Sequence, residues 1–354
     1  MTAASDMRER AALPLKVSQV EVDERWDRFV ATARDSTFCH LGGWAEVMSD
    51  VLRHECTYLV AESADGVWEG VLPLVQVRGI LGRFLVSVPF LNDGGPVGTE
   101  SARRHLVEYA VREADRLRVD LLELRARIAV PGPVATSNRK ITVHLDLPDS
   151  VDALWAKTFK AKLRSQIRRP TKEGMTARSG LEEMPAFYEV FARNMRDLGT
   201  PVLPRRFFER MARVFGNQVT FTTVYTATGD PAAAGCCLTW REEIEIVWAS
   251  SLRRYNRLSP NMLLYASVME AAIAAGIRRF NFGRCTPGGP THRFKQQWGG
   301  VDVPLPWAFW SKRGGAVGTP SPDKPFLRLA AAAWSRLPVA VTKRIGPTLA
   351  RQLP

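Results

Sequence analysis

The feature that most constrains the fold is a pattern of short strands and one helix that occurs twice. The first copy predicts strands at residues 57–63, 68–77 and 84–89, a helix at 101–117 and a closing strand at 119–124. The second predicts strands at residues 219–226, 232–240 and 244–250, a helix at 261–275 and a closing strand at 278–282. Apolar residues recur about every 3.6 positions in both helices. The residues therefore predict an α+β protein with two similar units.

The length of 354 residues suits two domains. We expect a first unit at residues 15–147, a second at 148–311 and a tail at 312–354. One helix is expected at residues 151–169, ended by Pro170, and further helices at 185–198 and 205–215. In the tail, a Gly/Pro-rich linker at 314–322 leads to a basic amphipathic helix at about 326–337.

Several features point to a cytoplasmic protein. The first ten residues are polar, and no run approaches the roughly 18 apolar residues that span a bilayer. The five cysteines are odd in number and form no C-x-x-C pair, so buried free thiols are expected. The histidines show no metal-ligand spacing, and no metal site is predicted.

The positive charge is concentrated in two segments. Residues 157–172 carry seven bases and no acid, and residues 312–354 carry eight bases and one acid. On the helix expected at residues 151–169, four bases project from one side, namely Lys157, Lys160, Arg164 and Arg168. Without interleaved acids this face repels itself, which favours a bound anion over a merely solvated surface. The candidate anions are the phosphates of a transfer RNA or the pyrophosphate of a nucleotide sugar; no DNA partner is expected.

A second group of cations follows the strand that ends at Phe282. Arg284, Arg293 and Lys295 lie among glycines and aromatic residues there. An acyl-transfer site needs fixed positive charge near the oxyanion that forms on the carbonyl. The alternative is a surface turn with solvated bases. A nucleophilic Cys285 activated by His292 is a further, weaker hypothesis.

The run Asn281–Thr286, followed by His292–Gly299, resembles the signature of FemAB-type proteins associated with exosortase/PEP-CTERM exopolysaccharide systems. More distantly it resembles the Fem aminoacyl transferases that build peptidoglycan cross-bridges. Other matching stretches are residues 85–90, 164–170, 194–201 and 248–251. The resemblance implies two tandem GNAT-like (acyl-CoA N-acyltransferase-like) units.

The resemblance also assigns roles to individual residues. Lys295 would stabilise the oxyanion, with Phe294 and Arg284 beside it. The expected substrate-binding residues are Arg196, Asp197, Tyr255, Asn256, Asn261 and Trp298. From the residues alone, Arg196 and Asp197 could equally clamp a helix end. Asn281 replaces the Asp usual in these relatives, so no general base is assigned.

The donor is expected to be aminoacyl-tRNA, with no resident cofactor. Residues 253–260 stand where a GNAT protein has its glycine-rich pyrophosphate loop, but they contain no glycine, and Pro260 has no N–H. Acyl-CoA remains the alternative donor.

The leading function is acyl or aminoacyl transfer to an amine or hydroxyl of a sugar-containing or lipid-linked surface-polymer precursor. The alternatives are an acyl-CoA-dependent N-acetyltransferase and a non-catalytic membrane-associated scaffold. Residues 325–354 combine apolar and basic side chains. They would either place the protein on the inner, anionic face of the membrane or dock on its own body.

Overall fold

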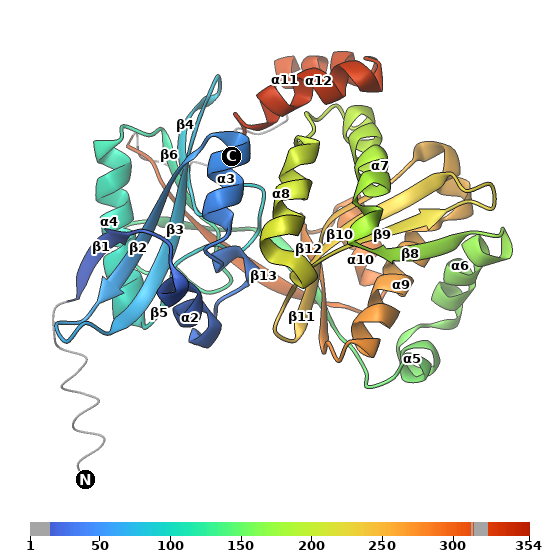
Figure 1. Ribbon diagram of the computed structural model, residues 1–354, viewed down its shortest axis with the longest axis horizontal. Helices are drawn as coiled ribbons and strands as arrows, with labels where there is room; N and C mark the ends of the chain where they lie inside the picture. Colours follow the sequence, from blue (N-terminus) through green and yellow to red (C-terminus); the bar gives the residue numbers. More distant parts are fainter. Residues whose placement is uncertain (1–14, 313, 315–324) are drawn as a thin grey trace, which may run out of the picture. The chain divides into compact units, whose positions relative to one another are not determined.

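The computed structural model describes residues 15–312, 314 and 325–354 (Figure 1). The chain forms two compact units. The first comprises Met1–Asn138, Pro304–Pro320 and Arg351–Pro354, and the second comprises Arg139–Val303 and Ser321–Ala350. Both are mixed sheets covered by helices, as the repeated sequence pattern predicts.

The first unit has a sheet in the strand order β1-β2-β3-β4-β6-β13, with β5 paired to β3. Its strands are β1 (Lys16–Val20), β2 (Glu55–Glu62), β3 (Trp68–Gly79), β4 (Gly82–Val86), β5 (Val97–Gly98), β6 (Leu121–Leu124) and β13 (Val301–Trp310). Strands β4 and β6 pair in parallel, whereas β1–β2, β2–β3, β3–β4, β3–β5 and β6–β13 are antiparallel pairs.

Helices cover both faces of this sheet. Helix α4 (Glu100–Arg116) begins at Thr99, whose side chain accepts from the Ala102 N–H, and packs on Leu59 and its neighbours. Helix α2 (Glu24–Thr32) lies on the opposite face, where the Trp26 and Tyr58 rings meet edge to face. Helix α3 (Trp44–Leu52) contacts β2. None of β1, α2 and α3 was predicted.

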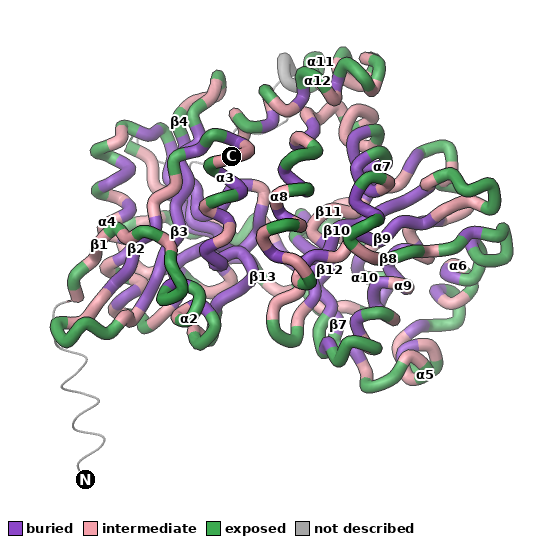
Figure 2. The backbone as a smooth tube through the Cα atoms, in the orientation of Figure 1, coloured by how far each residue is buried: buried purple, intermediate pink, exposed green. Residues whose placement is uncertain are grey.

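The second unit repeats this arrangement in the order β7-β12-β11-β10-β9-β8. Its strands are β7 (Ala135–Asp146), β8 (Thr176–Gly180), β9 (Val219–Tyr225), β10 (Pro231–Trp240), β11 (Glu243–Ser251) and β12 (Arg279–Cys285). Helix α9 (Pro260–Ala274) packs on one face, and helices α7 (Met184–Asp197) and α8 (Arg205–Phe215) pack on the other through a group of phenylalanine rings. Figure 2 shows the buried backbone along the central strands.

The division between the units differs from the expected one. It falls after Asn138, not after residue 147, because β7 pairs with β12 from Ile141 to Asp146. The expected end of the second unit at residue 311 also changes. Residues from Pro304 belong to the first unit, since β13 places Ala308 opposite Leu124 of β6. The first unit thus receives β13 from a segment remote in sequence from its other strands.

The segment predicted as one helix at residues 151–169 is broken. It forms α5 (Val151–Ala153), a π-helical turn η2 (Leu154–Thr158) and α6 (Ala161–Lys172). The break occurs because Phe159 adopts an extended conformation and buries its ring against Trp298. Pro170 does not end α6, which continues for two more residues.

Arg164 bridges this break, because its guanidinium donates to the carbonyls of Trp155 (3.2 Å) and Phe159 (2.7 Å). The cationic stripe is therefore not a continuous helical face. Arg168 lies over the Trp155 ring at 5.3 Å, whereas Lys157 and Lys160 are exposed.

The tail forms two helices, α11 (Pro325–Trp334) and α12 (Val339–Ala350), rather than the single helix expected at 326–337. Helix α12 contacts α7 through a face of small residues: Thr342, Gly346 and Ala350 are buried. Lys343 forms an ion pair with Glu189 of α7. The Gly346 backbone lies so close to Val202 that an added Cβ would be 3.1 Å from its side chain. Docking on the protein, one of the two sequence-based alternatives, is therefore observed for α12.

Arg164→Met should lower the free energy of unfolding by about 1.5–3 kcal/mol, because two carbonyls at the break lose a charged donor. Lys162→Met removes an exposed cation from the same helix and should change stability by less than about 0.5 kcal/mol. Urea unfolding followed by circular dichroism measures both. Equal effects of the two substitutions would contradict a bridging role for Arg164.

Candidate active site

A cavity of about 280 Å³ lies at the N-terminal end of α9 in the second unit. Its lining comes from α6, the end of β11, the turn before α9, the start of α9 and helix α10 (Pro290–Gln296) with the residue after it. The lining residues are Gln166, Ser251, Asn256, Ser259, Pro260, Asn261, Met262, Phe294 and Gln297. All are neutral, and most can donate or accept hydrogen bonds.

The cavity forms beside two parallel strands that pair over a short distance. Strands β11 and β12 are paired only from Glu243–Arg279 to Glu245–Asn281. The buried Asn281 side chain of β12 forms hydrogen bonds with both neighbouring strands, β7 and β11. Its Oδ1 accepts from the hydroxyl of Thr142 (2.5 Å) and the N–H of Gly283 (2.8 Å), and its Nδ2 donates to Glu243 (3.0 Å). Gly283 has φ +71°, which favours glycine.

Asn261 is the polar centre of the cavity. Its Nδ2 donates to Ser251 Oγ at 3.2 Å, and Ser251 Oγ donates to Asn256 Oδ1 at 3.2 Å. Asn261 Oδ1 is buried and has no hydrogen-bond partner within the described part of the chain. A buried acceptor without a donor is costly, so this oxygen is suited to an N–H or O–H of a ligand.

The turn before α9 differs from a phosphate-binding loop. Residues Arg253–Leu258 form a 3₁₀ segment, and Ser259 at the N-cap has φ +57° without a side-chain capping bond. The first residue of the helix is Pro260, which has no N–H to offer. Ser259 therefore occupies the N-cap position but does not cap the helix with its hydroxyl.

Lys295 lies on α10 and is buried, with 3 % of its surface exposed. Its ammonium donates to the carbonyls of Gly283 (2.5 Å) and Arg284 (2.9 Å), which leaves one N–H without an assigned acceptor. Burial lowers the pKa of Lys295 to about 8. It does not line the cavity, although Phe294 beside it does. The segment expected as a loop is thus the end of β12, a turn and a helix.

The thiol hypothesis for Cys285 receives no geometric support. Burial raises the pKa of Cys285, which disfavours the thiolate. His292 is bound elsewhere: its Nε2 lies 2.9 Å from Asp302 and its Nδ1 accepts from the Gly288 N–H. All five cysteines are free; Cys56 is half-buried and the others are buried.

The remaining predicted residues divide into two groups. Asn256, Asn261 and Phe294 meet at the cavity. Tyr255 packs against the core with the Arg254 guanidinium 4.6 Å from its ring, and Trp298 is fully buried beside Phe159. Neither lines the cavity.

Arg284 is exposed at the end of β12. Arg196 donates to Asp197 (2.6 Å) and to the Leu337 carbonyl (2.9 Å), while the Asp197 carbonyl accepts from Arg253. This pair therefore holds the end of α7 to the tail, which matches the clamp that was one of its two predicted roles.

Sequence reasoning missed Gln166, Ser251 and Gln297. Ser251 and Gln166 lie within matched stretches of the resemblance, but nothing in a single polar side chain predicts that it faces a cavity. Gln297 donates to the Met262 sulfur at 3.8 Å, a contact that depends on where α10 lies. Among the described residues, no group of acidic, histidine or cysteine side chains is suited to a metal ion, and no helix could cross a membrane.

Residues 157–296 match the family profile of the acetyltransferase (GNAT) domain. This segment contains Lys295 and all the cavity residues except Gln297. No curated protein sequence matches the chain.

Solved structures share the fold at low identity. FemX is 13 % identical with a TM-score of 0.61, over 83 % of this chain and 97 % of that one. A tandem GNAT protein from the clavulanic acid biosynthesis pathway is 14 % identical with a TM-score of 0.53, over 86 % and 100 %. L-PGS from Bacillus licheniformis is 14 % identical with a TM-score of 0.53, over 91 % and 100 %. The chain has a GNAT-like fold, and the matched domain supports an acyltransferase.

Lys295 should titrate near pH 8 rather than near 10.5. Between these values the unfolded chain holds the proton and the native chain does not, so native stability should rise with pH. The gain attributable to Lys295 should approach about 3 kcal/mol, measured as the difference between the natural chain and Lys295→Met. The Cε signal of Lys295 in carbon NMR gives the pKa directly. A midpoint above pH 10 would contradict the prediction.

Proposed function

We propose that the chain transfers an aminoacyl group from aminoacyl-tRNA to an amine or hydroxyl of a sugar-containing surface-polymer precursor. The observation that carries this proposal is the cavity at α9: it offers neutral amides and hydroxyls, and its turn has no glycine-rich cradle. Such a site suits the ester end of a donor better than the pyrophosphate of coenzyme A. The resemblance to Fem transferases points to the same donor and to an acceptor in the cell envelope.

The chemistry requires a nucleophile beside the ester carbonyl and a donor for the oxyanion. In this proposal Asn261 Oδ1 accepts an N–H or O–H of the acceptor and orients its lone pair toward the carbonyl carbon. Attack forms the new C–N or C–O bond and a tetrahedral intermediate. Its collapse breaks the ester C–O bond to the tRNA ribose, and the acceptor's proton leaves with the ribose oxygen. The ammonium of Lys295, which lies next to Phe294 rather than in the cavity lining, stabilises the negative charge of the tetrahedral intermediate through its positive charge.

In this proposal the tRNA phosphates contact the bases between residues 157 and 168. Lys157 and Lys160 are exposed, whereas Arg164 and Arg168 are bound to backbone and ring partners. We therefore assign the phosphate contacts mainly to the two lysines, and a supporting role to Arg168.

A second candidate is an acyl-CoA-dependent N-acyltransferase. The match of residues 157–296 to the acetyltransferase (GNAT) domain favours it. The two candidates differ in the donor, so a donor assay separates them.

With a labelled mixture of aminoacyl-tRNAs and a lipid-linked or nucleotide-linked sugar acceptor, the chain should form a labelled product that acetyl-CoA does not yield. Lys295→Ala should reduce the rate by about 10²–10³, and the natural chain should lose activity above pH 8 as the ammonium deprotonates. Turnover with acetyl-CoA alone would reverse the order of the candidates.

The role of Lys295 is tested separately by the shape of the pH profile. If Lys295 only holds the Gly283 and Arg284 carbonyls, Lys295→Ala should lower the melting temperature and leave the profile of the residual activity unchanged. Loss of the alkaline limb at an unchanged melting temperature supports oxyanion stabilisation. Lys162→Ala, at an exposed lysine, is the matched control.

We further propose that the tail holds the protein on an anionic membrane surface, where a lipid-linked acceptor would be found. Helix α12 turns its small residues to the protein and leaves Val341 and Ile345 about 40 % exposed, while Leu329 of α11 is 74 % exposed. Arg328, Arg336 and Arg344, on the same part of the chain, are exposed as well. Large apolar side chains beside bases suit an interface with anionic headgroups, to which each base contributes about 1 kcal/mol.

The double variant Val341→Ser/Ile345→Ser should sediment less with vesicles containing phosphatidylglycerol, at an unchanged melting temperature. Val67→Ser/Ile80→Ser is the control, since it removes two exposed apolar residues from the first unit. Equal binding by both variants would show that these side chains do not contact lipid.

A further inference from the structure

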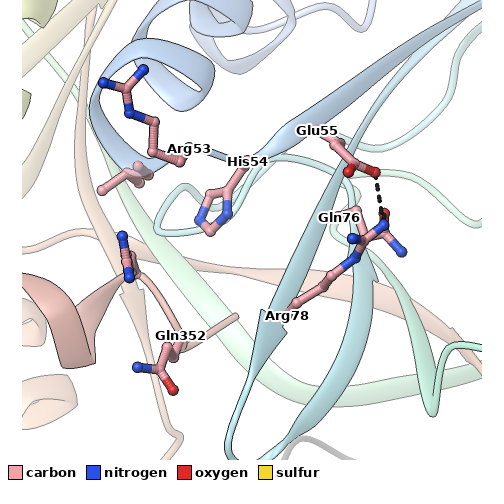
Figure 3. A pocket seen from close by; sticks show the side chains of 8 residues that line it. Arg53, His54, Glu55, Gln76, Arg78 and Gln352 are labelled. Carbon is pink, nitrogen blue, oxygen red and sulfur yellow. Dashed lines mark hydrogen bonds and ion pairs between the residues drawn. The ribbon is translucent and has the colours of Figure 1, made fainter.

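A second cavity, of about 300 Å³, lies in the first unit, which contains none of the residues assigned to acyl transfer. It is formed by the end of α3, the start of β2, the strand β3 and residues 351–352 (Figure 3). The polar residues that face it are Arg53, His54, Glu55, Gln76, Arg78 and Arg351.

Local backbone structure directs these side chains to one place. Arg53 ends α3 in the left-handed conformation, with φ +60°, and the His54 N–H then bonds back to Met48. Glu55 begins β2 opposite Gln76 of β3. Arg78 follows two residues later and therefore shares a face of the strand with Gln76.

Residues 351–352 are packed tightly against the β3–β4 hairpin. The side-chain oxygen of Gln352 accepts from the Ile80 N–H at 3.1 Å. Gly79 leaves so little space that an added Cβ would be 2.6 Å from Gln352. These contacts fix the position of Arg351 beside the cavity.

His54 is, with Gln76, one of the two buried polar residues that line the cavity. It is 8 % exposed, and its Nε2 has no hydrogen-bond partner among the described residues. Figure 3 shows its ring pointing into the cavity. Burial, aided by the charge of Arg351, lowers the pKa of His54 to about 4. At neutral pH the ring is therefore uncharged and can present an N–H.

The cavity has an excess of positive charge and of donors. Glu55 is its only acid, and Arg78 neutralises it at 2.9 Å. The same guanidinium nitrogen donates to Gln76 Oε1 at 2.9 Å, so the amide NH₂ of Gln76 remains available as a donor. Arg53 and Arg351 have no ion pair within the described residues. The lining of the cavity therefore offers these two arginines no carboxylate that is not already paired.

We propose that this cavity binds the phosphate group of a small phosphorylated ligand. A tetrahedral oxyanion can accept from several donors at once, which suits the combination of guanidinium, amide and imidazole groups. The volume is at the lower end of the range for small-molecule sites. The site lies in the first unit and does not depend on the proposed transfer reaction.

The test uses the full chain at pH 7.5 and constant ionic strength, with the His54 ring signals followed by NMR and assigned through His54→Gln. Inorganic phosphate should produce a saturable shift of the His54 signals that chloride does not. Sulfate should act like phosphate, and acetate should bind at least about tenfold more weakly. A linear, unsaturated response to phosphate, or equal binding of acetate, would overturn the proposal.

Two matched variants locate the site. Arg351→Gln should weaken phosphate binding at least about tenfold, since it removes a charged donor. Arg104→Gln, at an exposed arginine of α4, should leave binding unchanged. Equal effects of the two substitutions would show that phosphate binding depends only on the net charge of the protein. If Arg351→Gln does not fold, the phosphate titration of the natural chain alone tests the proposal.

Discussion

The hydrogen bonds of Asn281 are the constraint on which the candidate site depends. They tie β12 to its neighbours β7 and β11 and hold Gly283 in a conformation that favours glycine. The Gly283 carbonyl then accepts from Lys295, which fixes α10 on the sheet. Helix α10 in turn supplies Phe294 to the cavity. One buried amide thus links three strands, the lysine and the lining of the site, as expected for a fully bonded polar network in a core.

Much of the fold could be predicted from periodicity and turn residues. The strands and helices of the two repeated cores were placed to within a few residues, and α8 was placed at its observed bounds. Elements that depend on distant partners were missed. Strand β13 forms because β6 offers an open edge, and α6 begins after a break because Phe159 finds a buried ring pocket near Trp298. Local sequence does not encode either partner.

Prediction of the site was partial for a related reason. The motif around residue 295 and the turn before α9 pointed to Phe294, Asn256 and Asn261, which the fold brings together. Periodicity cannot tell a cation that faces a ligand from one that satisfies carbonyls. Arg164 and Lys295 both donate to backbone oxygens, and Trp298, an aromatic residue in the same motif, fills the core. Backbone acceptors without partners are invisible in a sequence, although they determine where such side chains turn.

The crossing of β13 into the first unit has a consequence for biosynthesis. A ribosome delivers strands β1–β6 of that unit well before β13, which begins only after the second unit's strands have been made. During this interval β6 presents an open edge, and open edges invite pairing with other chains. Closing the sheet also requires a contact between residues 122–124 and 308–310, a large sequence separation that slows folding. The nascent chain is thus expected to be most vulnerable to aggregation, and most dependent on chaperones, just before residue 310 emerges.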